Sequence, residues 1–200
     1  LGTAFEALGR GDDALKAIER ALADWEALHD RLGAARTLGL LGDLHLRAGR
    51  LDRALDCQQG SLERMEAMGN LPGAARARAA LGEVRSARGE HRLALDLGYA
   101  AKMESEAIGD RRGSARALRG MSVAFRARSR NLEALHCAWD SVDRQIALGA
   151  GLGEEDAAGL RRGVRAAADT GLLAAWDLAR TDPGEAPRVL ARAFLLAESS

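Results

Sequence analysis

The chain has 200 residues, with 29 basic and 29 acidic side chains, so its formal net charge is zero. A neutral balance argues against a protein that binds nucleic acid over its whole surface, because such proteins are usually basic. Ala, Leu, Arg and Glu, which favour helices, dominate over the β-branched and aromatic residues that a sheet requires. We therefore predict an all-α protein.

A period of 40 residues runs through the sequence. It is defined by a leucine followed by a glycine, a second glycine, and then an alanine–leucine pair. Each of these positions recurs through four copies. The leucine position holds Leu1, Leu41, Leu81 and Met121; the second glycine position holds Gly9, Gly49, Gly89 and Ser129; and the alanine position holds Ala14, Ala54, Ala94 and Ala134. A fixed period of this length indicates a repeat architecture in which each unit packs against its neighbours.

Each period predicts two helices of about 18 residues, separated by residues that end or begin a helix. Gly49 and Gly89 fit the left-handed position after a helix, and Asp30, Asn70 and Asp110 fit N-caps. In chain order, the predicted helices lie at about 1–8, 12–28, 31–48, 51–68, 71–88, 91–108, 111–128 and 131–148.

The fifth copy is degraded. Gly153 opens it, Gly171 is predicted to end its first helix, and Pro183 interrupts its second. We predict one solenoid over 1–200, which we expect to be a fragment of a longer protein. Its repeats are predicted at about 1–29, 30–69, 70–109 and 110–149, with the degraded copy at 150–181 and a terminal helix at about 186–198.

The segment from Leu38 through Leu41-Gly42 and His45 to Ala54 resembles the W-x2-L-G-x2-Y pattern of tetratricopeptide (TPR) repeats. The length of the period resembles the long form found in Pins-type adaptors, kinesin light chains and many bacterial multidomain regulators. This resemblance implies a right-handed superhelical solenoid of antiparallel helix pairs. It also implies a protein-interaction scaffold that is not an enzyme.

By the register of that family, the first helix of each pair lines a concave groove. The predicted peptide-binding positions are Arg36, Asp43, Arg47, Arg76, Glu83, Arg116, Arg119 and Arg126. Arg36, Arg76 and Arg116 recur at the repeat period and form a predicted ladder. Because arginine suits bidentate binding of carboxylates, we hypothesise a groove that prefers an acidic or C-terminal peptide. The alternative is that these arginines form a solvated face or pair with Asp43 and Glu83.

The sequence shows few signals for metal binding, phosphate binding, catalysis or nucleic-acid binding. The histidines lack a metal-ligand spacing, and Gly149 to Gly153 lacks the Lys-Ser/Thr end of a phosphate-binding loop. We therefore predict no catalytic residue, cofactor or metal. Cys57 and Cys137 lie two repeats apart, and we expect them to be reduced thiols of a cytoplasmic protein. Few aromatic residues accompany the arginines, which argues against nucleic acid as a partner. No apolar run is long enough to cross a membrane.

The prediction for function is a scaffold that binds a protein or peptide segment in its concave groove. Two alternatives stay open. The chain is the sensor or scaffold region of a larger bacterial regulator whose DNA-binding or catalytic domain lies elsewhere, or it is a self-associating module that forms a homo-oligomer through exposed solenoid ends. The three tryptophans, Trp25, Trp139 and Trp176, are expected to pack between repeats.

Overall fold

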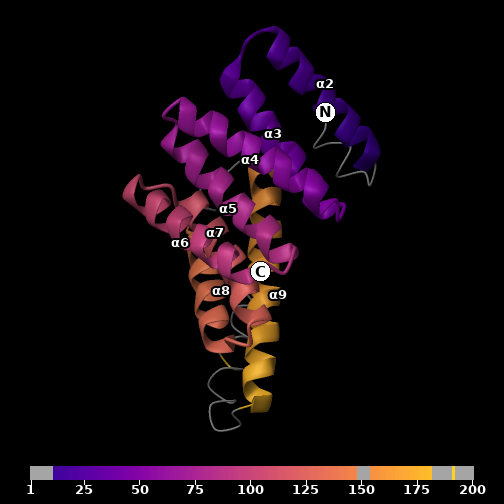
Figure 1. Cartoon of the computed structure of the whole chain (residues 1–200). Helices are drawn as coiled ribbons and strands as arrows, with labels where there is room; N and C mark the ends of the chain where they lie inside the picture. The colour runs from indigo at the N-terminus through magenta and orange to yellow at the C-terminus, as the bar shows by residue number, and fades with distance from the viewer. Residues whose placement is uncertain (1–10, 148–153, 182–190, 192–200) are drawn as a thin grey trace.

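The computed structural model describes residues 11–147, 154–181 and 191. All regular structure in these ranges is helical, and consecutive helices lie side by side as antiparallel pairs (Figure 1). The chain is therefore an all-α solenoid, as the repeats predict. The helices are α2 (Gly11–Ala27), α3 (Arg31–Arg47), α4 (Leu51–Ala67), α5 (Leu71–Ala87), α6 (His91–Ala107), α7 (Arg111–Ala127), α8 (Asn131–Ile146) and α9 (Glu154–Thr181).

The ends of the helices follow from local chemistry. The Asp110 carboxylate accepts a hydrogen bond from the backbone N–H of Gly113 at 3.1 Å, and Asp30 and Asn70 cap α3 and α5 in the same way. Gly49 and Gly89, with φ of 71° and 81°, adopt the left-handed conformation after α3 and α5. The predicted caps and turns are thus confirmed at these positions.

Small residues set the spacing between the paired helices. The four alanines of the repeat column, Ala14, Ala54, Ala94 and Ala134, are at most 3% exposed. A Cβ at Gly82 would lie 3.2 Å from the backbone oxygen of Ala94, so a larger residue would push α5 and α6 apart by a few tenths of an ångström. His45, which stands in the aromatic position of the repeat pattern, is 4% exposed and so packs inside the solenoid.

Helix α9 differs from the prediction. Gly171 is predicted to end a helix, but α9 continues through it for 28 residues, from Glu154 to Thr181. The reason is an apolar stripe that keeps helical spacing across the glycine, with Ala167 and Ala168 before it and Ala174 and Ala175 after it. A glycine inside a helix costs only about 1 kcal/mol relative to alanine. The burial of the apolar stripe outweighs this cost, so the helix continues through Gly171.

Helix α9 packs along α8 and also contacts α7 (Figure 1). The largest core cluster lies between these helices and includes Leu135, Trp139 and Val142 of α8 with Val164 of α9. Trp139 is therefore buried, as expected. Trp176, in contrast, is 60% exposed, so the expectation that it packs between repeats is wrong.

Several predicted elements lie outside the described residues. These are the helix at about 1–8, the glycine-rich segment 149–153 and the terminal helix at about 186–198.

Candidate functional site

The concave side of the solenoid holds a cavity of about 820 Å³. Its walls come mainly from α3, α5, α7 and α9, which we call the inner helices. Apolar parts of the wall include Leu46, Ala87 and Val123, one from each of the first three inner helices. The charged parts are five arginines and two acids: Arg47, Arg112, Arg116, Arg119, Arg162, Asp43 and Glu83. The lining is therefore cationic by formal charge.

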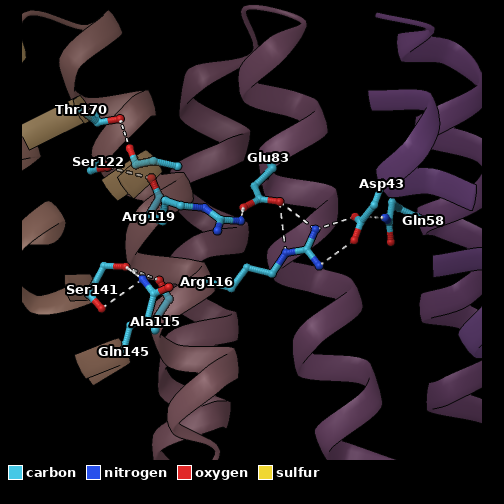
Figure 2. Close-up of polar contacts among 11 residues, drawn as sticks. Asp43, Gln58, Glu83, Ala115, Arg116, Arg119, Ser122, Ser141, Gln145 and Thr170 are labelled. Atoms are coloured by element: carbon cyan, nitrogen blue, oxygen red, sulfur yellow. Dashed lines mark hydrogen bonds and ion pairs between the residues drawn. The ribbon is translucent and has the colours of Figure 1, made fainter. Parts of the chain in front are cut away.

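Arg116 of α7 lines this cavity and joins three inner helices (Figure 2). Its Nη2 donates to Asp43 Oδ1 of α3 at 2.6 Å and to Glu83 Oε2 of α5 at 2.7 Å. Its Nε also donates to Glu83 Oε2 at 3.0 Å, and its Nη1 donates to Asp43 Oδ2 at 3.2 Å. We call Arg116, Asp43 and Glu83 the central triad.

Two further side chains orient the triad. Arg119 Nη2 donates to the second oxygen of Glu83, Oε1, at 2.5 Å. Gln58, which is 1% exposed, comes from the outer helix α4. Its Nε2 donates to Asp43 Oδ1 at 2.9 Å and to the backbone oxygen of Gly39 at 3.0 Å. Both acids of the cavity therefore have several fixed donors (Figure 2).

The surroundings hold the triad in its charged state. Burial alone would raise the pKa of Glu83, but the charges of Arg116 and Arg119 and their hydrogen bonds lower it to about 2. For Arg116, burial acts to lower the pKa, and the attraction of Glu83 and Asp43 outweighs it and raises the pKa. The triad is thus an ion-pair network with 14–26% exposed side chains that persists across the neutral pH range.

Arg47 and Arg162 occupy a different part of the lining. Both are exposed, and they belong to the first and the last of the inner helices. The pKa of Arg47 is lowered by burial and by the positive charges of Arg162, Arg116 and Arg119, which outweigh the attraction of Glu83. More positive than negative groups of the lining therefore act on Arg47, although the cavity also holds two acids.

The structure brings together five of the eight predicted groove residues. Asp43, Arg47, Glu83, Arg116 and Arg119 all line the cavity.

It does not bring the other three there. Arg36 is exposed on α3 and does not line the cavity. Arg76 donates through Nε to the carboxylate of Asp110 at 2.7 Å, and Arg126 donates through Nε to Asp177 of α9 at 3.1 Å. The predicted ladder of Arg36, Arg76 and Arg116 is therefore not one surface. Arg76 turns to Asp110, Arg116 turns to Asp43 and Glu83, and Arg36 does not line the cavity.

Sequence reasoning missed Arg112, Arg162 and Gln58. Arg162 lies on α9, whose course the repeat register did not predict, and Gln58 belongs to an outer helix that the register assigns no groove contact. Arg112 lies in the first turn of α7, before the positions of that helix that the repeat register assigns to the groove. No signal in the sequence separates these residues from the other polar residues of their helices.

Within the described ranges, no group of three or more His, Cys, Asp and Glu side chains is placed to hold a metal ion. Among these same residues, no helix is both long and apolar enough to cross a membrane. Cys57 and Cys137 are both free thiols, and burial raises the pKa of each.

The fold and its concave, charged cavity define a helical-repeat protein. Residues 1–67, about a third of the chain, match the family model of the tetratricopeptide repeat, the family that the sequence resembles. No curated protein matches the chain. Among solved structures, the chain is similar to BtubC (BKLC) from P. vanneervenii, with a TM-score of 0.69 and 16% sequence identity. That similarity covers 100% of this chain and 78% of the other, and at this identity it supports the fold alone.

Proposed function

We propose that this chain is a non-enzymatic scaffold that binds an acidic segment of another protein in its concave cavity. TPR repeats generally mediate protein–protein interaction, and the family is generally non-catalytic. The observation that carries the acidic preference is the cavity lining, in which five arginines face two acids. A cytoplasmic location belongs to the same proposal, supported by the two free thiols.

The cavity has the size and chemistry for such a segment. Its volume of about 820 Å³ falls in the range of about 300–1,000 Å³ that is usual for ligand pockets. Guanidinium groups bind carboxylates in a planar, bidentate geometry, which gives direction as well as strength. Leu46, Ala87 and Val123 add an apolar wall against which the uncharged part of a bound segment packs.

The pairing of Arg116 and Arg119 with Asp43 and Glu83 refines the hypothesis drawn from the sequence. Those two arginines have internal carboxylate partners, so they supply the positive field and the shape of the site. Among the other arginines of the lining, the exposed Arg162 of α9 is the group that we expect an incoming acid to meet.

A direct test uses two labelled peptides of equal length, hexaglutamate and hexaglutamine, with fluorescence anisotropy as the readout. We expect hexaglutamate to bind and hexaglutamine not to bind. We also expect the affinity to fall as salt is added, because the Debye length shortens to about 10 Å at 0.1 M ionic strength. Equal binding of the two peptides, or no binding of hexaglutamate at low salt, would contradict the proposal.

A further inference from the structure

A second cavity lies at one edge of the solenoid, where the turn between α4 and α5 meets the last turn of α6. Its volume is about 340 Å³, and none of the residues that line it also lines the larger, concave cavity. We call it the edge pocket. The lining residues that matter below are Glu66, Leu71, Ala74, Arg78, Glu104 and Ile108.

One part of the edge pocket is an apolar wall that is open to solvent. Ala74 is buried, whereas Leu71 is 63% exposed and Ile108 is 37% exposed. Exposed apolar side chains that gather at a hollow mark a surface that contacts a ligand or another protein. The wall therefore offers contact area both inside the pocket and, through Leu71, beside it.

The other part of the edge pocket is charged. Arg78 of α5 donates through Nη2 to Glu66 Oε1 of α4 at 2.5 Å and through Nη1 to Glu104 Oε2 of α6. Among the residues that the structure describes, the second oxygen of each carboxylate accepts no hydrogen bond. One arginine thus serves two carboxylates, and each carboxylate keeps one acceptor oxygen for a ligand.

The repeat period provides a comparison for these charges, because positions 66, 71, 78 and 104 recur 40 residues before and 40 residues after. The earlier set is Glu26, Arg31, Leu38 and Arg64, and the later set is Glu106, Arg111, Leu118 and Arg144. Each of these sets has a formal charge of +1, whereas Glu66, Leu71, Arg78 and Glu104 have a formal charge of −1. Of the three equivalent places, the edge pocket alone has a negative charge.

The exchange of an arginine for Glu104 is what makes the edge pocket different. In the neighbouring places, an acid of one second helix pairs with an arginine of the next second helix. Glu26 pairs with Arg64 at 2.9 Å, and Glu106 pairs with Arg144 at 2.9 Å. In the edge pocket, Glu66 has an acid opposite it, and the arginine comes from the first helix, α5. The balance of charge therefore favours a cation at this place.

We propose that the edge pocket binds a lysine side chain of a partner protein that carries apolar residues beside that lysine. The ammonium group donates to the second oxygens of Glu66 and Glu104, and the aliphatic stem lies against the apolar wall. An apolar neighbour of the lysine packs on the exposed Leu71. This site is separate from the concave cavity and does not rest on the proposed function.

The geometry favours lysine over arginine. The two oxygens left for a ligand belong to different carboxylates on α4 and α6. A guanidinium group is best suited to both oxygens of one carboxylate, whereas an ammonium group is compact and carries three donors. The volume of about 340 Å³ is at the lower end of the range for ligand pockets, about 300–1,000 Å³, which suits one long side chain.

The test is an NMR titration of the isotope-labelled full chain with two peptides of equal length. They are acetyl-Leu-Lys-Leu-Lys-Leu-amide and acetyl-Leu-Gln-Leu-Gln-Leu-amide, each added to about 1 mM. The lysine peptide should shift the amide signals of residues 69–74 and 104–108, and the glutamine peptide should not. Equal shifts with the two peptides, or no shift with the lysine peptide, would overturn the proposal.

Variants test which charges act. Glu66→Gln should weaken binding of the lysine peptide about tenfold, the loss of one charge-assisted hydrogen bond. Glu26→Gln is the matched control, because Glu26 holds the equivalent position one repeat earlier and does not line the pocket. Glu104→Arg gives the pocket the arginine that its neighbours have at this position, so it should abolish binding. Circular dichroism checks that each variant is folded, and if Glu104→Arg is not, the Glu66→Gln pair decides.

The remaining outcomes are equally clear. If Glu66→Gln and Glu26→Gln bind the lysine peptide equally well, the site is not the edge pocket. If n-butylammonium binds as tightly as the lysine peptide, the apolar neighbours add nothing, and docking of a protein segment is overturned in favour of a small amine. Hexaglutamate binding reports on the concave cavity and should be the same in Glu66→Gln as in the wild type, so the two sites can fail separately.

Discussion

Helices α3 to α8 and helix α9 are built by different rules. The former are 16 or 17 residues long, and α9 has 28. Turns with a positive φ end the first five of the shorter helices, α3 to α7, at Gly49, Gly69, Gly89, Gly109 and Ser129. Helix α9 passes through Gly171 because its apolar stripe against α8 continues beyond that residue. Local turn and cap residues therefore set the length of a repeat helix. Where those residues are absent, as in α9, the core contacts set the length of the helix.

The substitution with the largest expected effect tests whether the apolar core attaches α9 to α8. Leu135 is 0% exposed and belongs to the cluster that α8 shares with α9. Leu135→Ala should lower the free energy of unfolding by about 2–5 kcal/mol, since it leaves a cavity. Urea unfolding followed by circular dichroism measures it.

Leu132→Ala is the matched control, on the same helix and 48% exposed. It should cost less than about 1 kcal/mol. Equal losses for the two variants would show that the cluster is not what attaches α9.

A second prediction concerns the triad that joins the regular repeats. The pKa of Glu83 falls from the ordinary value of 4.5 to about 2 on folding. Its stabilising contribution is therefore complete above about pH 4.5 and is lost as the pH falls toward 2, and it amounts to roughly 3 kcal/mol. Glu83→Gln should remove this part of the acid dependence, measured as the unfolding free energy at a series of pH values.

Glu133→Gln provides the comparison for Glu83. Glu133 pairs with Arg130 on the surface of α8 and is 39% exposed, so its loss should change stability by less than about 1 kcal/mol. If both variants keep the wild-type acid profile, the triad contributes nothing to stability.

A third prediction compares two N-caps of the regular repeats. Asp110 and Asp30 each accept a hydrogen bond from a backbone N–H, and Asp110 also accepts one from Arg76. Asp30→Ala should cost about 1 kcal/mol, the usual value of a cap. Asp110→Ala should cost more, by up to about 1 kcal/mol, in thermal or urea unfolding. Identical losses would mean that the Arg76 pair is without energetic effect.

The substitutions with the smallest expected effect test the left-handed turns that end the repeat helices. Ser129 has a φ of 59°, a left-handed conformation that costs a non-glycine residue energy. Ser129→Gly should therefore stabilise the protein by about 1 kcal/mol in urea unfolding. Gly109→Ala is the converse variant: a Cβ there meets nothing within 4 Å, but φ is 71°, so it should destabilise by a similar amount. A gain from both substitutions would contradict this account of the helix ends.

The sequence was sufficient wherever structure is decided locally. Asp110 and Gly89 act through their own backbone neighbours, so their roles as cap and turn could be predicted from spacing. The alanines that mark the period are buried in all four copies, because the same position of each repeat packs against the same neighbouring helix.

Long side chains were harder to predict. Arg76 and Arg116 hold equivalent places in the repeat, but Arg76 bonds to a cap residue and Arg116 bonds to two acids in the cavity. The partner of each arginine depends on which carboxylate lies near it in the folded structure. The repeat period of the sequence does not contain this information. The entry of Arg162 into the cavity depends in turn on α9 and on the curvature of the whole solenoid.

The contact between Arg116 and Asp43 has a consequence for how such an array can change. Solenoids usually interact only between adjacent units, so that units are added or removed with little effect on the rest. Here the side chain of α7 reaches past α5 to α3, two repeats away. Inserting a unit between them would carry Arg116 away from Asp43, and deleting the unit that contains α5 would remove Glu83 from the network. This ion-pair network therefore depends on the number of repeats between α3 and α7.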